Sequence, residues 1–358
     1  MTVTVPLPQG GYPVHIQPGA LRQTGALLAP LGIDRWAVTT DETVAALYGG
    51  AVLDSLRSAG LSGQLLTFPA GEAHKTPETW LSLCRQLAQE GFTRSDGLLA
   101  LGGGVTGDMA GFVAACYQRG MALAQLPTTL LSQVDSAVGG KTAVDLPAGK
   151  NLVGAFHQPS LVLCDVDTLA TLPAVELANG LAEALKYGLL ASSALFDTLS
   201  KGTKQADWSA LIGECVQIKA ALVLQDEYDI GARQLLNLGH TIGHAVEACS
   251  RYAIRHGHAV AMGMLWAARL SERLGIAETP LSPQIKAALV TNHLPTELPL
   301  LLHLRFQLGD LLFQLFPLLG TLHHFFQALV LGDDNGITGD LADDAPIEDM
   351  YIQGRGIQ

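Results

Sequence analysis

The side chains best suited to chemistry are histidines gathered in the second half of the chain. Four of the eleven histidines fall within 19 residues: His240, His244, His256 and His258. His240 and His244 are four residues apart, so in a helix they share one face. Together with Glu183, which stands in the apolar segment GLAEALKYG, these imidazoles are the donor set of a catalytic Zn²⁺ with an open position. Each histidine taken alone could also be an ordinary core or surface residue with no role in metal binding. The pattern H-x-x-x-H lacks the Glu of the zinc-protease helix.

Lysines gather in the same part of the chain. The sequence has eight, and four of them are Lys141, Lys150, Lys186 and Lys219. The first two lie in a glycine-punctuated loop, VDSAVGGKTAVDLPAGKN (134–151), which suits the anchoring of phosphate by point charges. Lysines of a solvated loop are the alternative. Lys186 follows Glu183 by three residues, which is also the spacing of an ordinary ion pair on a helix surface.

A glycine-rich turn follows the expected strand GLLAL. The residues Gly102-Gly103-Gly104-Val105-Thr106-Gly107-Asp108 read G-x-G-x-x-G between a strand and a helix. Glycines let the backbone approach a pyrophosphate, and a helix N-terminus attracts anions. The motif follows the third expected strand, and no acid ends a strand about 20 residues later, so it is not the standard dinucleotide fingerprint. A turn that only eases packing is the alternative.

Polar residues also follow three other expected strands. These are Asp41, the segment 70–75 (AGEAHK) and Pro127-Thr128-Thr129. Open α/β sheets bind ligands at the carboxyl ends of their strands, so we expect one ligand to lie across these turns. Asp41 could hold a ribose hydroxyl, or it could simply cap the helix that follows it.

The elements that position these residues change in type along the chain. Short apolar strands at 36–40, 65–68, 97–101, 122–126 and 161–165 alternate with helices such as 44–59 and 76–90. This order predicts an α/β N-terminal domain with a parallel, Rossmann-like sheet. After residue 172 only helices are expected, at 176–190, 209–225, 233–249 and 258–274. We therefore predict an NAD-binding type of α/β domain over 1–172 and a mainly α-helical metal- and substrate-binding domain over 173–358.

Composition narrows the functional classes. The net charge of −12 disfavours a nucleic-acid-binding protein, which needs a basic surface. The five cysteines are scattered without a C-x-x-C pair, which disfavours disulfides and thiolate metal sites. The N-terminus MTVTVPLPQG has no basic start and no apolar core, so no signal peptide is expected. We expect a cytoplasmic protein.

The segment 298–358 is atypical. It is rich in Leu, Phe and His and then in Asp; from Thr296 onward it carries nine acids and two bases, −7 of the total −12. Residues 311–332 carry no formal charge over about the length of a membrane span. They also contain Gln, Pro and His, so we expect no membrane insertion. A shifted reading frame is one interpretation of this segment, which an intact mass equal to that of the printed sequence would exclude.

Seven motifs in succession resemble those of the 3-dehydroquinate synthase family, within the sugar-phosphate cyclases. They are GGGVTGDMAGF, YQRG, LPTTLLSQVDSAVGGKTAVD, GKNLVGAFHQP, GLAEALKYG, NLGHTIGHAVE and HGHAVAMGM. The resemblance runs in order from about Gly71 to Leu274. Its long motifs make it specific for the superfamily and favour this member of it.

The resemblance implies cofactors and their residues. It implies Zn²⁺ or Co²⁺ on Glu183, His240 and His256. It implies NAD on Asp41, Gly71, Glu72, Lys75, Gly104, Val105, Thr106, Gly107, Asp108, Thr128, Thr129, Lys141, Lys150, Thr168, Leu169 and Thr171. It implies substrate contacts or catalytic roles for Asp135, Lys141, Asn151, Lys186, Lys219, Arg233, Asn237 and His244, and a contact from Arg119 to the neighbouring site of a homodimer.

The resemblance also implies a reaction. The substrate would be 3-deoxy-D-arabino-heptulosonate 7-phosphate, a step of the shikimate pathway. Transient oxidation at C5 by NAD⁺ acidifies the C4 proton, phosphate leaves by β-elimination, the ketone is reduced again, and an intramolecular aldol reaction closes the ring. Lys141, Asn237 and His244 would gather the phosphate, while Lys219 and Arg233 would meet the carboxylate. Relatives that use glucose 6-phosphate or sedoheptulose 7-phosphate have no carboxylate for such a cationic pair.

The sequence departs from the family in two places. The family usually has His-Gly-Glu where this chain has His256-Gly257-His258, and we expect His258 to lie near the metal ligands rather than to bind the ion. The family's Lys near the C-terminus is missing, because no lysine follows Lys286. Three alternatives stay open: another sugar-phosphate cyclase, an NAD- and metal-dependent polyol dehydrogenase, and a homologue whose activity is impaired by the altered tail.

Overall fold

The computed structural model describes residues 1–8, 10–204 and 206–299. Its strands are β1 (Thr2–Val5), β2 (Tyr12–Gln17), β3 (Arg35–Asp41), β4 (Ser62–Phe68), β5 (Gly97–Gly102), β6 (Ala122–Pro127), β7 (Lys141–Leu146), β8 (Gly149–Phe156) and β9 (Leu161–Asp165). Its α-helices include α1 (Thr24–Leu28), α3 (Gly50–Ser58), α4 (Pro77–Gln89), α5 (Gly104–Cys116), α6 (Ala174–Ala191), α7 (Ser193–Ser200), α8 (Trp208–Gln225), α9 (His240–Cys249), α10 (His256–Arg273) and α11 (Ser282–Thr291).

A seven-stranded sheet forms the first half of the described chain. Its strand order is β1-β2-β9-β6-β5-β3-β4, in which only β1 and β2 pair antiparallel. The central strands are apolar runs that are buried on both faces, as a parallel sheet covered by helices requires. The five expected strands are confirmed, whereas β1 and β2 were not predicted.

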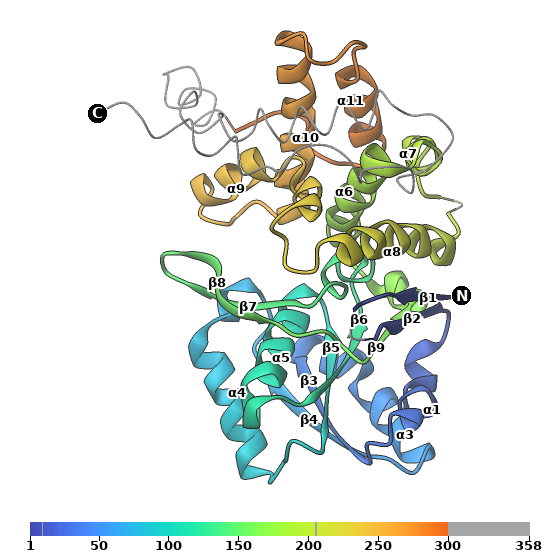
Figure 1. Ribbon diagram of the computed structural model, residues 1–358, viewed down its shortest axis with the longest axis vertical. Coiled ribbons are helices and arrows are strands. Elements are labelled where there is room, and N and C mark those ends of the chain that lie inside the picture. The colour runs from blue at the N-terminus through green and yellow to red at the C-terminus, as the bar shows by residue number, and fades with distance from the viewer. Residues whose placement is uncertain (9, 205, 300–358) are drawn as a thin grey trace.

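The second half of the described chain is helical, as the sequence predicted. We call residues 1–172 the sheet lobe and residues 173–299 the helical lobe. In Figure 1 the sheet lobe lies at the bottom and the helical lobe at the top. The short helix η7 (Val166–Thr171) ends the sheet lobe, and α6 begins two residues after the boundary. α7 and α11 were not expected.

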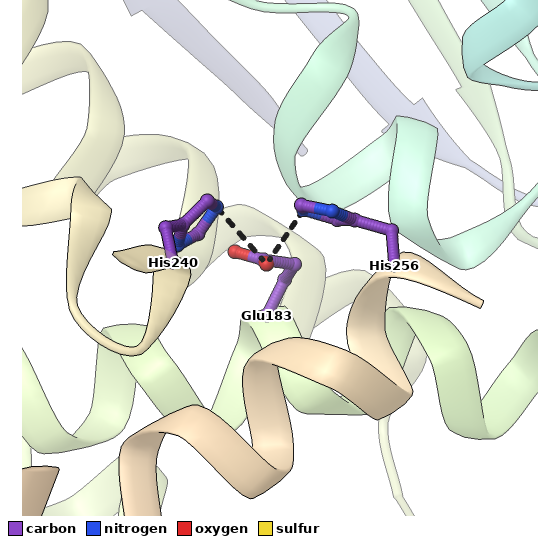
Figure 2. Close-up of side chains that lie close together, drawn as sticks. All are labelled: Glu183, His240 and His256. Atoms are coloured by element: carbon purple, nitrogen blue, oxygen red, sulfur yellow. Dashed lines mark ion pairs between the residues drawn. The ribbon is translucent and has the colours of Figure 1, made fainter. Parts of the chain in front are cut away.

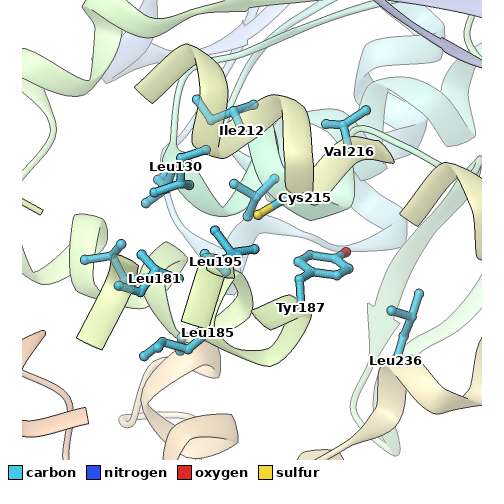
Figure 3. Close-up of a cluster of buried hydrophobic side chains, with 14 of the residues drawn as sticks. Leu130, Leu181, Leu185, Tyr187, Leu195, Ile212, Cys215, Val216 and Leu236 are labelled. Atoms are coloured by element: carbon cyan, nitrogen blue, oxygen red, sulfur yellow. The ribbon is translucent and has the colours of Figure 1, made fainter. Parts of the chain in front are cut away.

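Apolar packing around α6 joins the two lobes. Leu181, Leu185 and Tyr187 of α6 pack with Ile212 and Val216 of α8, as Figure 3 shows. The same cluster includes buried residues of β1 and β2, so the core of the helical lobe continues into the edge of the sheet. A helix that is apolar nearly all round must be buried, and α6 is buried from Ala178 to Leu189.

Two expectations for local structure were wrong. The glycine-punctuated segment 134–151 is not one loop, because β7 and β8 pair as an antiparallel hairpin that projects between the lobes in Figure 1. The helix expected over 233–249 is broken: a short helix η8 (Ala232–Asn237) is followed by Gly239 and then α9. Gly239 has a φ of 81°, in the left-handed region that glycine favours.

No described helix is both long and apolar enough to cross a membrane. The segment 311–332 and the rest of the atypical tail from residue 300 lie outside the described residues.

Candidate metal and substrate site

Glu183, His240 and His256 converge on one point, each from a different helix (Figure 2). The Nε2 atoms of His256 and His240 lie 3.5 and 3.9 Å from Oε1 of Glu183. Ligand atoms of the three residues all lie within 4.8 Å of one another. The structure therefore brings together the three side chains that the sequence assigned to one ion.

Close backbone packing sets the positions of the two histidines, which are the first residues of α9 and α10. A Cβ on Gly239 would lie 2.7 Å from the carbonyl oxygen of Val260 in α10, so only glycine allows α9 to start so close to that helix. The amide of Gly257 donates to Oδ1 of Asn179 at 2.7 Å, which ties the start of α10 to α6 one turn before Glu183.

The Glu183 carboxylate fits a metal ion because the described protein leaves it incompletely satisfied. It is fully buried and forms an ion pair with Lys186, yet neither oxygen accepts a hydrogen bond from any described residue. Buried carboxylates ordinarily have several partners. One carboxylate and two imidazoles, with room for substrate oxygens, are the ligands of catalytic Zn²⁺ or Co²⁺. The surface ion pair considered for Glu183 and Lys186 is instead buried.

Protonation in this cluster follows from burial and neighbouring charge. Burial raises the pKa of Glu183, but Lys186, His256 and His240 together outweigh burial and hold this pKa low. Burial and Lys186 lower the pKa of His240 to about 3, so its imidazole is neutral and can bind a cation. Burial also lowers the pKa of His256, but Glu183 and Glu247 outweigh burial and raise it to about 9. Metal binding must therefore displace a proton from His256.

A second donor cluster adjoins the first. His244, Glu247 and His256 also lie within reach of one ion. His244 is exposed, with its ring centroid 5.4 Å from that of His240. Glu247 is already paired with Lys150 at 3.1 Å, and Nδ1 of His256 faces it at 3.4 Å. Because these partners satisfy Glu247, the cluster around Glu183 is the better metal site. His258 belongs to neither group.

Cations predicted for the substrate border the metal cluster, and each is held by an acid or by carbonyls. Lys219 is buried and donates to Oδ1 and to the carbonyl of Asp135, both at 2.7 Å. Tyr187 donates to the same Oδ1 at 2.5 Å. Burial raises the pKa of Asp135, but Lys219 and Lys186 outweigh it, so the pKa lies well below the usual range. Burial lowers the pKa of Lys219.

Arg233 is buried beside this group. It donates to the carbonyls of Glu227 at 2.7 Å and Gly139 at 3.1 Å. A Cβ on Gly139 would lie 2.3 Å from Nη2 of Arg233, so the guanidinium needs a glycine there. Asn237, by contrast, is exposed at the end of η8.

The β7–β8 hairpin carries further predicted residues that pair with both lobes. Lys141 pairs with Asp229 of the helical lobe. Lys150 pairs with Glu72 at 3.0 Å and with Glu247. Asn151 accepts from Lys75 at 2.5 Å, and Lys75 also pairs with Asp108 at 2.5 Å. Lys141 and Lys150 lie in paired strands rather than in a loop, and both have acidic partners, although Lys141 is solvent-exposed.

The predicted NAD residues lie at the carboxyl edge of the sheet. β5 ends at Gly102, and α5 begins at Gly104, which confirms the strand–turn–helix context of Gly104, Val105, Thr106, Gly107 and Asp108. The amide of Thr128 donates to the carbonyl of Gly102 at 3.0 Å, which sets the 127–129 turn beside the glycine turn. Gly71 precedes the short helix η4 (Glu72–His74) that carries Glu72.

Asp41 and the 168–171 segment lie together at the same edge. Asp41 accepts from the amides of Thr43 and Val44, so its capping role is confirmed. The hydroxyl of Tyr48, a few residues on, contacts Thr171 and the carbonyl of Thr168. Leu169, in the same segment, is buried.

Arg119 is separate from all of these residues. It is exposed at the end of the short helix η5 (Tyr117–Arg119), between the end of α5 and the start of β6. α5 starts at the carboxyl edge of the sheet, so Arg119 lies at the opposite edge, away from the metal cluster of its own chain.

Two residues of the site were not predicted, Tyr187 and Glu247. Glu247 follows His240 by seven residues and His244 by three, which places all three on one helical face. That spacing was available in the sequence.

Comparison with known proteins gives a consistent result. Family models described as "3-dehydroquinate synthase N-terminal" and "3-dehydroquinate synthase C-terminal" match residues 65–179 and 180–312. The second match ends at residue 312, inside the segment 298–358, whose atypical character stays a prediction. The models meet inside α6, and the domain boundary at 172 stays a prediction.

The 3-dehydroquinate synthase of Neisseria gonorrhoeae is 48% identical over 305 residues, which cover 83% of this chain and 85% of the relative. A crystal structure of 2-deoxy-scyllo-inosose synthase complexed with carbaglucose-6-phosphate, NAD⁺ and Co²⁺ is 26% identical, with a TM-score of 0.75 and 83% of each chain covered. A 2-epi-5-epi-valiolone synthase from Streptomyces hygroscopicus with NAD⁺ and Zn²⁺ bound is 30% identical, with a TM-score of 0.74, and 80% of this chain and 82% of that chain covered.

Proposed function

The chain belongs to the 3-dehydroquinate synthase family, and we propose that it converts 3-deoxy-D-arabino-heptulosonate 7-phosphate into 3-dehydroquinate and inorganic phosphate. The observation that carries the proposal is the convergence of Glu183, His240 and His256 beside buried cations. NAD and Zn²⁺ or Co²⁺ are the cofactors, in keeping with the solved relatives.

We assign the ion to Glu183, His240 and His256, and NAD to the turns at the carboxyl edge of the sheet. When bound, the ion would supply Lewis-acid polarisation of the substrate hydroxyls, and NAD would accept a hydride and return it. Glu183 supplies the negative charge, and His240 supplies a neutral imidazole. The backbone packing at Gly239 and Gly257 holds both histidines before any ligand arrives, which lowers the cost of binding.

We assign the substrate carboxylate to Lys219 and Arg233. Both are buried, and a buried cation without an anion is costly, so the pair favours an acid substrate over a neutral sugar phosphate. Asp135 keeps Lys219 in place and stays ionised, so it can also accept a hydrogen bond from a substrate hydroxyl.

We assign the phosphate to Lys141, Asn237 and His244. Lys141 pairs with Asp229, and the substrate phosphate would take the place of that carboxylate. Asn237 and His244 are exposed on the helical lobe, where a ligand can reach them. Asn151 would contact the substrate, and Lys186 would face it beside Glu183.

We also propose a homodimer and a cytoplasmic location. Arg119 lies at the sheet edge opposite its own site, so a role for it in catalysis requires a second copy of the chain. Sedimentation of the purified protein tests the dimer. If Arg119 acts in the partner's site, mixing Arg119→Ala protein with Glu183→Gln protein should restore part of the activity.

The function is tested by a phosphate-release assay on the purified full chain, with and without a chelator. We expect phosphate release that the chelator abolishes, with no net NADH at 340 nm. A polyol dehydrogenase would instead form NADH in proportion to product. Turnover of glucose 6-phosphate or sedoheptulose 7-phosphate in preference to the heptulosonate phosphate would identify another cyclase, and an inert chain that still binds NAD would indicate an impaired homologue.

A further inference from the structure

Glu247 is a buried acid to which the proposed reaction assigns no role. It lies in α9, one turn after His244, with a relative exposure of 1%. Its two oxygens face different partners. Oε2 lies 3.4 Å from Nδ1 of His256, and Oε1 lies 3.1 Å from Nζ of Lys150. Burial raises the pKa of Glu247, but His256 and Lys150 outweigh it, so the group stays ionised.

The contact between Glu247 and His256 indicates which ring nitrogen of His256 is available to a metal ion. A carboxylate that accepts from Nδ1–H keeps the proton there, so Nε2 is the nitrogen whose lone pair would bind a cation once its own proton has left. Nε2 of His256 is the atom that faces Glu183. His240 is oriented differently, because its Nδ1 faces the carbonyl of Leu238 at 3.2 Å. One proposed ligand is thus aligned by a neutral peptide group and the other by a charged side chain.

The contact with Lys150 extends this arrangement into the sheet lobe. Lys150 stands in β8, and its ammonium also pairs with Glu72 of η4, in the turn assigned to NAD. The ring of Tyr252, just after α9, lies under the same ammonium, with Nζ 4.8 Å from its centroid. The contacts form one chain from Glu72 through Lys150, Glu247 and His256 to Glu183.

Lys150 also argues against a second ion at Glu247. The carboxylate, His244 and His256 have the spacing for one, but Lys150 takes one oxygen of Glu247 at 3.1 Å and His256 takes the other. Both oxygens of Glu247 thus have a hydrogen-bond partner among the described residues, whereas neither oxygen of Glu183 has one. Glu247 therefore serves the ion at Glu183 indirectly.

We propose that Glu247 is a positioning residue for His256, and that Lys150 couples the metal site to the NAD-binding turn. The proposal rests on the metal and NAD assignments made above. A change at Glu72 when NAD binds would be transmitted through Lys150 to a metal ligand. Coupling of this kind is reciprocal, so NAD⁺ should change the affinity for the metal by the same factor as the metal changes the affinity for NAD⁺.

The test is a Co²⁺ titration of the metal-free full chain, followed by visible absorption and by competition with a chelator, with and without NAD⁺. Glu247→Gln should weaken Co²⁺ binding by about 10- to 100-fold. Lys150→Gln should weaken it less, and should remove the effect of NAD⁺ on Co²⁺ affinity. Glu176→Gln is the matched control: it removes the charge that pairs with Arg255, the neighbour of His256, while the amide oxygen of Gln can still accept from Asn179, which holds the start of α10. It should change the Co²⁺ affinity by less than about threefold.

The positioning role of Glu247 would be overturned if Glu247→Gln bound Co²⁺ with wild-type affinity, or if Glu247→Gln and Glu176→Gln lost equal amounts of Co²⁺ affinity. The coupling would be overturned if NAD⁺ still changed the Co²⁺ affinity of Lys150→Gln. A wild-type chain that bound no Co²⁺ would overturn both. NAD⁺ affinity of metal-free Glu247→Gln, together with its thermal unfolding, shows whether it is folded; if it is not, the Lys150→Gln titration decides. These measurements of Co²⁺ and NAD⁺ affinity do not depend on turnover, so a chain that releases no phosphate can still confirm or contradict the coupling.

Discussion

Two buried carboxylates, one in each lobe, differ in whether backbone amides donate hydrogen bonds to them. Asp165 ends β9 in the sheet lobe and accepts hydrogen bonds from the amides of Gly19, Leu21 and Asp167 at 2.8 to 3.0 Å. Glu183 in the helical lobe has an ammonium partner and no described hydrogen-bond donor. Asp165 joins the loop before α1 to the end of β9 and so stabilises the fold. Glu183 is left for a ligand, which costs stability and gives a binding site.

The sharpest way to break this comparison is to remove both charges at Glu183. Glu183→Leu combined with Lys186→Met should abolish phosphate release and weaken Co²⁺ or Zn²⁺ binding by more than about 100-fold, since a ligand is lost outright. The free energy of unfolding of the metal-free protein should stay unchanged or rise by about 1–4 kcal/mol, because an apolar replacement of a buried pair is often neutral or stabilising. Denaturant unfolding in chelator measures this. A large loss of stability would mean that the pair serves the fold.

The reciprocal change is Asp165→Ala. It leaves three amides without their charged acceptor, and we expect the free energy of unfolding to fall by about 3–5 kcal/mol. Co²⁺ affinity, measured on the protein that stays folded, should change little. If metal binding fell as much as stability, the two acids would not have separate roles.

Arg233→Ala tests whether a buried cation of the helical lobe, like Glu183, serves ligand binding. It should lower kcat/KM by about 2–4 kcal/mol equivalent, because a buried cation that meets the substrate carboxylate is lost. Steady-state phosphate release measures this. Arg22→Ala, at an exposed arginine of the sheet lobe, is the control. A kinetically silent Arg233→Ala would contradict the carboxylate assignment.

The smallest expected effect is on pH dependence. The pKa of His256 is raised from 6.5 to about 9 in the folded, metal-free protein. A raised pKa gives stability that is present below about pH 6.5 and is lost as the pH rises toward 9. We expect a loss of about 1–2 kcal/mol over this range, since the side chain is partly exposed. Denaturant unfolding at pH 6.5 and 9 measures it. His256→Gln should lose less, and an equal loss would assign the dependence to another group.

The sequence predicted the parallel strands from local pattern, whereas the ligand set Glu183, His240 and His256 was implied by the family resemblance, because these residues lie on three different helices. β9 was predicted over its full length as LVLCD, and the spacing of His240 and His244 marked a helical face. The β7–β8 hairpin was missed because neither strand alternates between buried and exposed residues, and because the glycines at 139, 140, 149 and 154 are typical of a loop. The contact of Glu247 with Lys150 joins residues 97 apart in the chain, and no local pattern encodes such a pair.

The two faces of the hairpin respond differently to ionic strength. It rests on α5 of the sheet lobe through apolar contacts, such as Val144 in the same buried cluster as Met109 and Val113. It meets the helical lobe mainly through the pairs Lys141–Asp229 and Lys150–Glu247, together with one aromatic contact between Phe156 and Tyr228. Dissolved ions screen the half-exposed Lys141 pair, act much less on the pair with the buried Glu247, and leave apolar packing intact. Moderate salt should therefore loosen the hairpin from the helical lobe at Lys141 first, while the hairpin stays packed on the sheet lobe.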